Sequence, residues 1–182
     1  MHGHALDGES YKAKVVGCDT FVHLVGVPHP SPAKAREFVS IDGKSAQEAI
    51  RVAAHAGVDH FIYLSVAHPA PVMHSYIEVR AECEAALRAS GLNATIVRPW
   101  YVLGPGHRWP LLLKPLYRAA ELIPSMREGA RRLGLVNRQQ MVGSLAAAVD
   151  APPNGIRVVE VPEIRLLGNG WQRDHRPVCL SN

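Results

Sequence analysis

The chain has 182 residues, which fits one domain of ordinary size, and 47% of them are hydrophobic, enough for a buried core. Its net charge is +4, but the basic residues are scattered and the densest group (Arg127, Arg131 and Arg132) has helical spacing, so we expect a solvated helix face and no nucleic-acid partner. No apolar run approaches the roughly 20 residues of a membrane span, and three widely spaced cysteines suggest neither a disulfide framework nor a zinc knuckle, which favours a reducing cytoplasm.

The first predicted strand lies near the beginning of the chain. After a short helix expected over residues 9–16, residues 20–27 form an apolar run of strand length, and a proline-rich segment follows at once. We interpret this run as a buried strand. His23 within it is either a ligand or a core residue, and a lone histidine in an apolar run is more often a core residue.

A long helix is predicted next, over residues 33–56. Its apolar residues repeat at helical spacing, and Gly57 stands where such a helix ends. Either Ser45 and Glu48 form a capping box, or Asp42-Gly43 is a weak point inside the helix.

The central part of the chain predicts a strand, a helix and a second strand. An apolar strand is predicted over residues 58–66, with Ser65 near its end. A helix is expected over residues 75–90, and residues 94–97 form the next strand before Pro99. This order builds parallel sheets, which bind ligands beyond the carboxyl ends of their strands. Ser65 and Pro99 fall at that edge, and Tyr76 lies at the start of the helix between them.

One face of the predicted helix over residues 75–90 carries a tyrosine and a cation one turn apart. A cation beside a phenol favours phenolate, so Tyr76 and Arg80, with Ser65 to hold a substrate oxygen, could make an acid/base device for carbonyl chemistry. In the alternative interpretation the tyrosine is half buried and the arginine is solvated, as on many helices. Glu84 and Arg88 are expected to form an ion pair on another face.

The remainder of the chain predicts a smaller lobe. We expect residues 1–104 to form the main domain, 105–150 a small substrate-side lobe, 151–167 a returning strand segment and 168–182 a polar tail without regular structure. Helices are expected over residues 115–123 and 140–149, and a strand over residues 156–161 that rejoins the sheet edge. Four aromatic residues either line an apolar pocket or fill the core of the lobe: Trp100, Tyr101, Trp109 and Tyr117.

In their order these features resemble the extended and atypical short-chain dehydrogenase/reductases, a group that includes NAD-dependent epimerase/dehydratases and NmrA-like NAD(P)-binding proteins. The segments that carry the resemblance cover residues 23–26, 57–66, Tyr76-x-x-x-Arg80 and 98–106, within a match over about residues 3–162. The resemblance implies an α/β fold with a Rossmann-like parallel sheet and flanking helices. It also implies NAD or NADP as the cofactor.

The resemblance also implies roles for individual residues. Ser65 matches the active-site serine and Tyr76 the catalytic tyrosine, and Arg80 stands where the family has lysine. An arginine supplies charge but forks its donors differently, so it does not simply replace a lysine bound to a ribose. The implied cofactor-binding residues are Asp7, Val25, Gly26, Ser65, Tyr76, Arg80 and Pro99.

The glycine-rich turn that binds the pyrophosphate in this family is missing from the sequence, which has neither G-x-x-G-x-x-G nor G-x-G-x-x-G. We therefore expect a Rossmann-like domain that is incomplete at its N-terminus, with an unpaired apolar edge on the strand near Phe21. The chain alone is expected to bind NAD(H) or NADP(H) weakly or not at all. No metal site is expected, because the ten histidines have no paired ligand spacing.

Two classes of function remain open. The first is an NAD(P)-dependent oxidoreductase or sugar-nucleotide-type epimerase/dehydratase that acts on a small molecule. The second is a non-catalytic dinucleotide-binding, sensor or assembly protein, or an inactive truncated fragment. Small residues also suggest a homodimer formed through the helices over residues 33–56 and 75–90.

Overall fold

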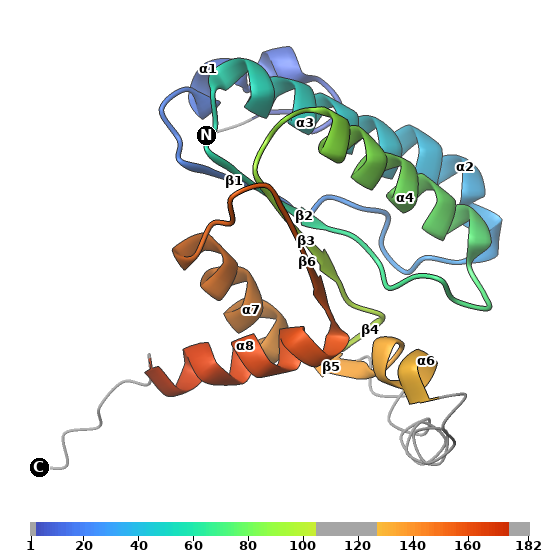
Figure 1. Cartoon of the computed structure of the whole chain (residues 1–182). Helices are drawn as coiled ribbons and strands as arrows, with labels where there is room; N and C mark the ends of the chain where they lie inside the picture. Colours follow the sequence, from blue (N-terminus) through green and yellow to red (C-terminus); the bar gives the residue numbers. More distant parts are fainter. Residues whose placement is uncertain (1–2, 105–126, 175–182) are drawn as a thin grey trace, which may run out of the picture. The chain divides into compact units, whose positions relative to one another are not determined.

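The computed structural model describes residues 3–104 and 127–174 (Figure 1). The chain divides into two compact units, the first formed by residues 1–98 and 152–159 and the second by residues 99–151 and 160–182. Each unit is described by itself. Within the described ranges, no helix has both the length and the apolar character needed to cross a membrane.

The first unit is built on a four-stranded sheet in the order β1-β2-β3-β6. Strand β2 pairs in parallel with both β1 and β3, so that Ile62 lies between Val22 and Thr95. Successive residues of β2 and β3 are buried, without the alternation of buried and exposed side chains seen in a half-exposed strand. This burial is typical of a parallel sheet that is covered on both faces. The predicted Rossmann-like α/β fold is confirmed, as is the return of a late strand to the sheet. The strands are β1 (Thr20–His23), β2 (His60–Leu64), β3 (Ala94–Arg98) and β6 (Ile156–Glu160).

Strand β1 is shorter and more exposed than the sequence predicts. It ends at His23, whereas the predicted strand continued to Val27, and the side chains of Val22 and Leu24 are 41% and 49% exposed. Among the described residues β1 pairs on one side only, because it is at the edge of the sheet. The prediction of a fully buried strand is therefore wrong, and the prediction of an apolar edge near Phe21 is confirmed.

The predicted helix over residues 33–56 is a succession of short helical pieces followed by α3. The π-helical segment η3 ends at Gly43, and Gly57 ends α3 in the left-handed conformation with a φ of 67°. The side chain of Ser45 donates to the Asp42 carbonyl inside this helical path, so the capping-box interpretation is wrong. The pieces are η2 (Pro32–Lys34), α2 (Ala35–Glu37), η3 (Phe38–Gly43) and α3 (Lys44–Ala56).

Helices α3 and α4 (His74–Ala89) lie side by side on one face of the sheet (Figure 1). The core between them and the strands contains large side chains that are fully buried, and each such side chain contributes roughly 1.5–3 kcal/mol by leaving water. Before β1, the 3-10 turn η1 (Gly8–Ser10) and α1 (Lys12–Val15) form the short helical segment that the sequence predicts. The largest core side chains are Phe38, Phe61, Tyr63, Leu87 and Ile96.

The second unit contains a two-stranded parallel sheet and a pair of helices, α7 and α8. Asn137 and Gln140 form a capping box at the start of α7, which contains the predicted helix over residues 140–149. The helix predicted over residues 115–123 lies outside the described residues. The elements are β4 (Tyr101–Leu103), α6 (Arg127–Arg132), β5 (Leu135–Asn137), α7 (Arg138–Asp150) and α8 (Val161–Asp174).

The prediction of an irregular tail from residue 168 is wrong for the described part, because α8 continues to Asp174. Val161, Ile164 and Gly168 are buried at helical spacing on one side of α8. Two glycines in its second half conceal this pattern in the sequence, since glycine disfavours helices in isolation.

The same glycines explain how closely α7 and α8 pack. A Cβ atom on Gly168 would lie 2.2 Å from the Gln140 carbonyl oxygen, and one on Gly143 would lie 2.8 Å from the Gly168 carbonyl oxygen. The two backbones therefore meet where no side chain has room.

We predict that Gly168→Ala lowers the free energy of unfolding by about 1–3 kcal/mol, because the added methyl group must push the helix backbones apart. Gly170→Ala is the matched control on the same helix, since no atom lies within 4 Å of its Cβ position. It should be neutral or stabilising by up to about 1 kcal/mol through helix propensity. Urea unfolding followed by circular dichroism measures both variants, and equal effects would contradict the backbone contact.

Candidate functional site

The carboxyl ends of β1 and β2 lie at the same edge of the sheet. In the parallel register His23 is opposite Tyr63, so residues 24–27 and Ser65 leave the sheet on the same side. Ligands of open α/β sheets bind beyond such strand ends. This edge is therefore the candidate site.

Arg80 reaches from α4 into the protein at this edge. Its Nη1 atom donates a hydrogen bond of 2.6 Å to the Leu64 carbonyl, and its Nη2 atom donates one of 2.5 Å to the Asp42 carboxylate. The side chain of Arg80 is only 5% exposed. The alternative in which this arginine is solvated is therefore wrong.

Asp42 is the acidic partner, and in the sequence it stands out only as part of a possible weak point inside a helix. Its side chain is fully buried, and its second oxygen accepts a hydrogen bond of 3.0 Å from the Val27 backbone amide. The signal in the sequence is a single acid in the otherwise apolar or small segment over residues 38–43. The pair thus joins η3, α4, the end of β2 and the loop after β1.

Two tyrosine rings enclose the Arg80 guanidinium. Its central carbon lies 5.7 Å from the centre of the Tyr63 ring and 5.2 Å from that of Tyr76, within the range of cation–π attraction. Tyr76 is half-buried and also packs against Phe38, with ring centres 4.9 Å apart. Burial raises the pKa of Tyr76 above its ordinary value, and the opposing effect of the Arg80 charge is smaller. The phenol is therefore protonated at neutral pH.

Ser65 belongs to a second polar cluster at the same edge. Its hydroxyl donates a hydrogen bond of 2.6 Å to Glu84, which also accepts one of 2.9 Å from Arg98 Nε and a second bond from Arg98 Nη2. His68 Nε2 lies 3.3 Å from the same Glu84 oxygen that Ser65 reaches. Glu84 is therefore the centre of a buried network of three neighbouring side chains.

The predicted ion pair of Glu84 with Arg88 is present, but it is the longest contact of this carboxylate, with the closest atoms 3.9 Å apart. Glu84 is only 3% exposed and faces the sheet. Its position four residues after Arg80, on the same helix face, was the signal that could have found it.

The charge of Glu84 follows from its surroundings. Burial alone would raise the pKa of this carboxyl group, but the hydrogen bonds from Arg98 and Ser65 outweigh burial and hold the pKa below its ordinary value. Glu84 is therefore ionised at neutral pH, and the proton of the Ser65 hydroxyl points toward it. Ser65 then offers its lone pairs in other directions.

The cofactor residues implied by the resemblance have different surroundings. Val25 and Gly26 are exposed in the loop after β1. A Cβ atom on Gly26 would lie 2.4 Å from Arg80 Nη2, so this loop backbone packs directly on the guanidinium.

Asp7 caps η1 by accepting a hydrogen bond from the Glu9 amide, and η1 contacts α1 and α3. Pro99 belongs to the second unit. The structure thus brings together Gly26, Arg80 and Tyr76, with Ser65 on the strand end that Arg80 contacts.

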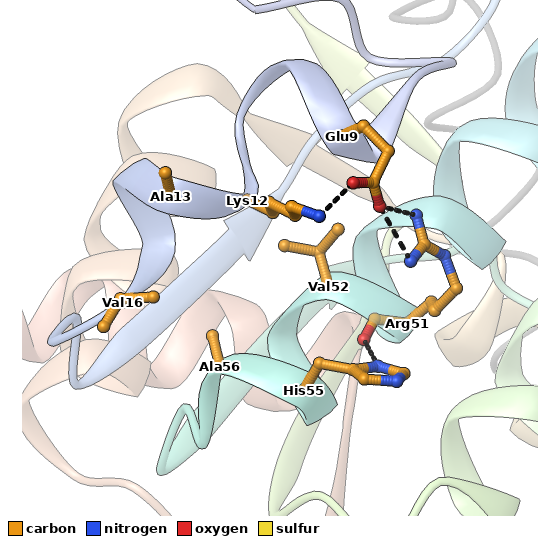
Figure 2. Close-up of a pocket in the computed structure, with 8 residues that line it drawn as sticks. All are labelled: Glu9, Lys12, Ala13, Val16, Arg51, Val52, His55 and Ala56. Atoms are coloured by element: carbon orange, nitrogen blue, oxygen red, sulfur yellow. Dashed lines mark hydrogen bonds and ion pairs between the residues drawn. The ribbon is translucent and has the colours of Figure 1, made fainter.

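A groove of about 360 Å³ follows the open edge of β1, and Val25 is one of its lining residues. A second groove of about 320 Å³ lies between α1 and α3 (Figure 2). At its rim the Glu9 carboxylate pairs with both Lys12 and Arg51, and Arg51 also pairs with Glu48, so each cation already has a carboxylate partner. The second groove contains none of the predicted site residues.

His23 is a core residue. It is 3% exposed and its ring stacks on those of Phe61 and Tyr63 at 6.4 and 5.8 Å between centres. Burial, with a smaller contribution from the Arg80 charge, lowers the pKa of His23 to about 4. Within residues 3–104 and 127–174, no group of three side chains is arranged to hold a metal ion.

The fold agrees with comparisons to known proteins. The family described as NAD(P)H-binding matches residues 1–108, and the chain therefore belongs to this family. A ceramide reductase of Caulobacter vibrioides is 27% identical over 155 residues, covering 85% of this chain and 47% of the relative. The chain thus spans about half the length of this curated relative.

Two solved structures illustrate the likeness in fold. The dTDP-glucose 4,6-dehydratase DesIV from Streptomyces venezuelae, with NAD and TYD bound, is 20% identical with a TM-score of 0.62, over 95% of this chain and 62% of that one. MoeE5 in complex with UDP-glucuronic acid and NAD is 18% identical with a TM-score of 0.64, over 85% and 60% of the two chains. At these identities the likeness concerns the fold alone.

We predict that His23→Phe removes part of the acid sensitivity of the protein. His23 in the folded state stays neutral down to a pH of about 4, whereas the unfolded chain takes up a proton near its ordinary pKa of 6.5. Folding stability is therefore lost as the pH falls from 6.5 toward 4, by about 3 kcal/mol at about 1.4 kcal/mol per unit. Urea unfolding across this range should give a shallower pH dependence for His23→Phe, and parallel curves would contradict the prediction.

Proposed function

We propose that this chain is the substrate-side part of an NAD(P)-dependent oxidoreductase of the short-chain dehydrogenase type, which reduces a carbonyl group of a small molecule. Tyr76 is the proton donor, and Ser65 contacts the substrate oxygen or its hydroxyl product. The positive charge of Arg80 supports these two residues electrostatically. A sugar-nucleotide epimerase or dehydratase would use the same residues.

One observation carries the proposal. The Arg80 guanidinium contacts both the Leu64 carbonyl, next to Ser65, and the ring of Tyr76. A single cation thus links the phenol to the end of the strand that bears the serine. Proton transfer to a substrate oxygen requires an acid and a hydroxyl close together, and the two contacts of Arg80 support this arrangement for Tyr76 and Ser65.

The protonation states suit proton transfer between the protein and a substrate oxygen. The ordinary pKa of a phenol is already well above neutral and burial raises that of Tyr76 further, so its phenol holds a proton at neutral pH and can give it to a carbonyl oxygen. The Ser65 hydroxyl points its own proton at Glu84, so it can accept a hydrogen bond from the hydroxyl group of an alcohol.

The residues present fit the ribose and nicotinamide side of a dinucleotide. Val25 and Gly26 expose backbone at the end of β1, and Gly26 lets this backbone approach the Arg80 guanidinium, where a side chain would have no room. When bound, the nicotinamide supplies the hydride for reduction. The full sequence contains no glycine-rich turn for the pyrophosphate, so the affinity of this chain alone for a dinucleotide should be low.

A second function is favoured by the contacts of Arg80. Both of its terminal nitrogen atoms donate to groups of the protein itself. Nη1 contacts the Leu64 carbonyl, and Nη2 contacts the fully buried Asp42 carboxylate. A cation held in this way supports the fold whether or not a ribose is bound. This observation favours a non-catalytic dinucleotide-binding, sensor or assembly protein.

The proposal extends to assembly and location. A homodimer would form through α3 and α4, and sedimentation velocity tests it. Cys18 and Cys83 are free thiols among the described residues, which suits the reducing cytoplasm proposed as the compartment.

We predict that calorimetric titration of the 182-residue chain with NADH and with NADPH gives weak binding or none. Micromolar affinity for either dinucleotide would contradict this prediction, because it would mean that the glycine-rich turn is not needed.

We further predict that Tyr76→Phe lowers turnover by about 10²–10⁴-fold and leaves dinucleotide affinity unchanged, since only the proton donor is lost. The measurement uses a form extended at its N-terminus by a strand and glycine-rich turn. It follows the reverse reaction, in which an alcohol group of ceramide or UDP-glucose gives a hydride to NAD or NADP, as a gain of nicotinamide absorbance. Binding without turnover in both the unchanged sequence and Tyr76→Phe would support the non-catalytic function.

A further inference from the structure

The loop after β1 carries the two exposed residues, Val25 and Gly26, that the proposed function assigns to the dinucleotide. The next residue, Val27, is buried, and its amide donates to a carboxylate oxygen of Asp42 at 3.0 Å. The anchored residue thus directly follows the pair that would face a ligand. The position of this anchor determines where the exposed backbone lies.

Asp42 does not hold the loop alone. Its other oxygen binds Arg80, whose second terminal nitrogen is held by the Leu64 carbonyl. The chain of contacts therefore runs from the loop amide through two buried charges to the end of β2. Gly26 packs against the guanidinium itself, so a movement of Arg80 would move the loop backbone.

We propose that Asp42 is a positioning residue, which sets the Val25–Val27 backbone at the distance from the Ser65 strand end that a bound dinucleotide requires. The part of its test that measures dinucleotide affinity rests on the proposed function. An ion pair kept only for stability could be replaced by apolar side chains of similar volume at little or no cost. A carboxylate that also accepts the Val27 amide cannot be replaced in this way without releasing the loop.

A second hydrogen bond of this loop is at the surface. Lys34 Nζ donates to the Pro28 carbonyl at 2.7 Å, between exposed groups. Water competes for such a contact, so it constrains the loop less than a buried one. The buried carboxylate is the stronger of the two anchors.

The test uses two changes in the full chain. Asp42→Asn keeps the shape of the side chain but removes its charge, and Asp42→Leu combined with Arg80→Met replaces the pair by apolar side chains. The double variant keeps the test decisive if Asp42→Asn does not fold, because it leaves no buried charge without a partner.

The matched control is Glu48→Gln. Glu48 also accepts a backbone amide, that of Gly8, and an arginine, Arg51, but its side chain is 27% exposed and it contacts η1 instead of the loop. The chemical change from carboxylate to amide is the same as in Asp42→Asn, but it is made at a more exposed side chain that does not contact the loop.

Amide hydrogen exchange at Val27 is the first readout, compared with global stability from urea unfolding. We expect exchange at Val27 to be about ten- to a hundredfold faster in the double variant, beyond any change in global stability, because a buried donor has lost its acceptor. Glu48→Gln should leave Val27 unchanged. Val27 protection that follows global stability alone in the double variant would overturn the proposal.

Titration with NADH and NADPH is the second readout. In a form that binds either dinucleotide, the double variant should bind about tenfold more weakly or worse, and Glu48→Gln should bind as before. Unchanged affinity in the double variant would overturn the proposal. If no form binds a dinucleotide, the proposed function fails, while a loss of protection at Val27 still supports the positioning role.

Discussion

The first unit depends on one buried ion pair. Asp42 and Arg80 are taken from water almost completely, and the loss of either partner would leave a buried charge uncompensated at a cost of about 3–5 kcal/mol. The pair endures because each charge has further partners: the Leu64 carbonyl, the Val27 amide and the faces of two tyrosine rings. One interaction thus unites a helix, a strand end and a loop that lie far apart in the sequence.

Elements with a strong local signal could be predicted. The apolar run of β2, the helical spacing of α4 and the glycine at the end of α3 each determine local structure through nearby residues only. Strand β1 and helix α8 could not be predicted in full. Exposure of β1 depends on which strand lies beside it, and α8 depends on a glycine contact with α7 that propensity opposes.

The candidate site divides in the same way. Ser65, Tyr76 and Arg80 could be named because their spacing matches a known motif. The signals for their partners Asp42 and Glu84 are weaker, because the Arg80 contact joins residues 38 positions apart and the Ser65 contact joins residues 19 positions apart. Arg80 stands where the family has lysine, and the direction in which its guanidinium points depends on the distant Asp42 carboxylate.

The π-helical segment η3 has a consequence for how this protein can vary in length. A π turn holds more residues than an α turn, so η3 accommodates an extra residue before the regular α-helical winding of α3 begins. Deleting one residue between 38 and 43 would let this segment wind as an ordinary α-helix, with the faces on either side kept, whereas a deletion inside α3 would rotate the preceding positions by about 100°. Because Asp42 lies within the π segment, an alignment gap there in a homologue would signal a different partner for the arginine.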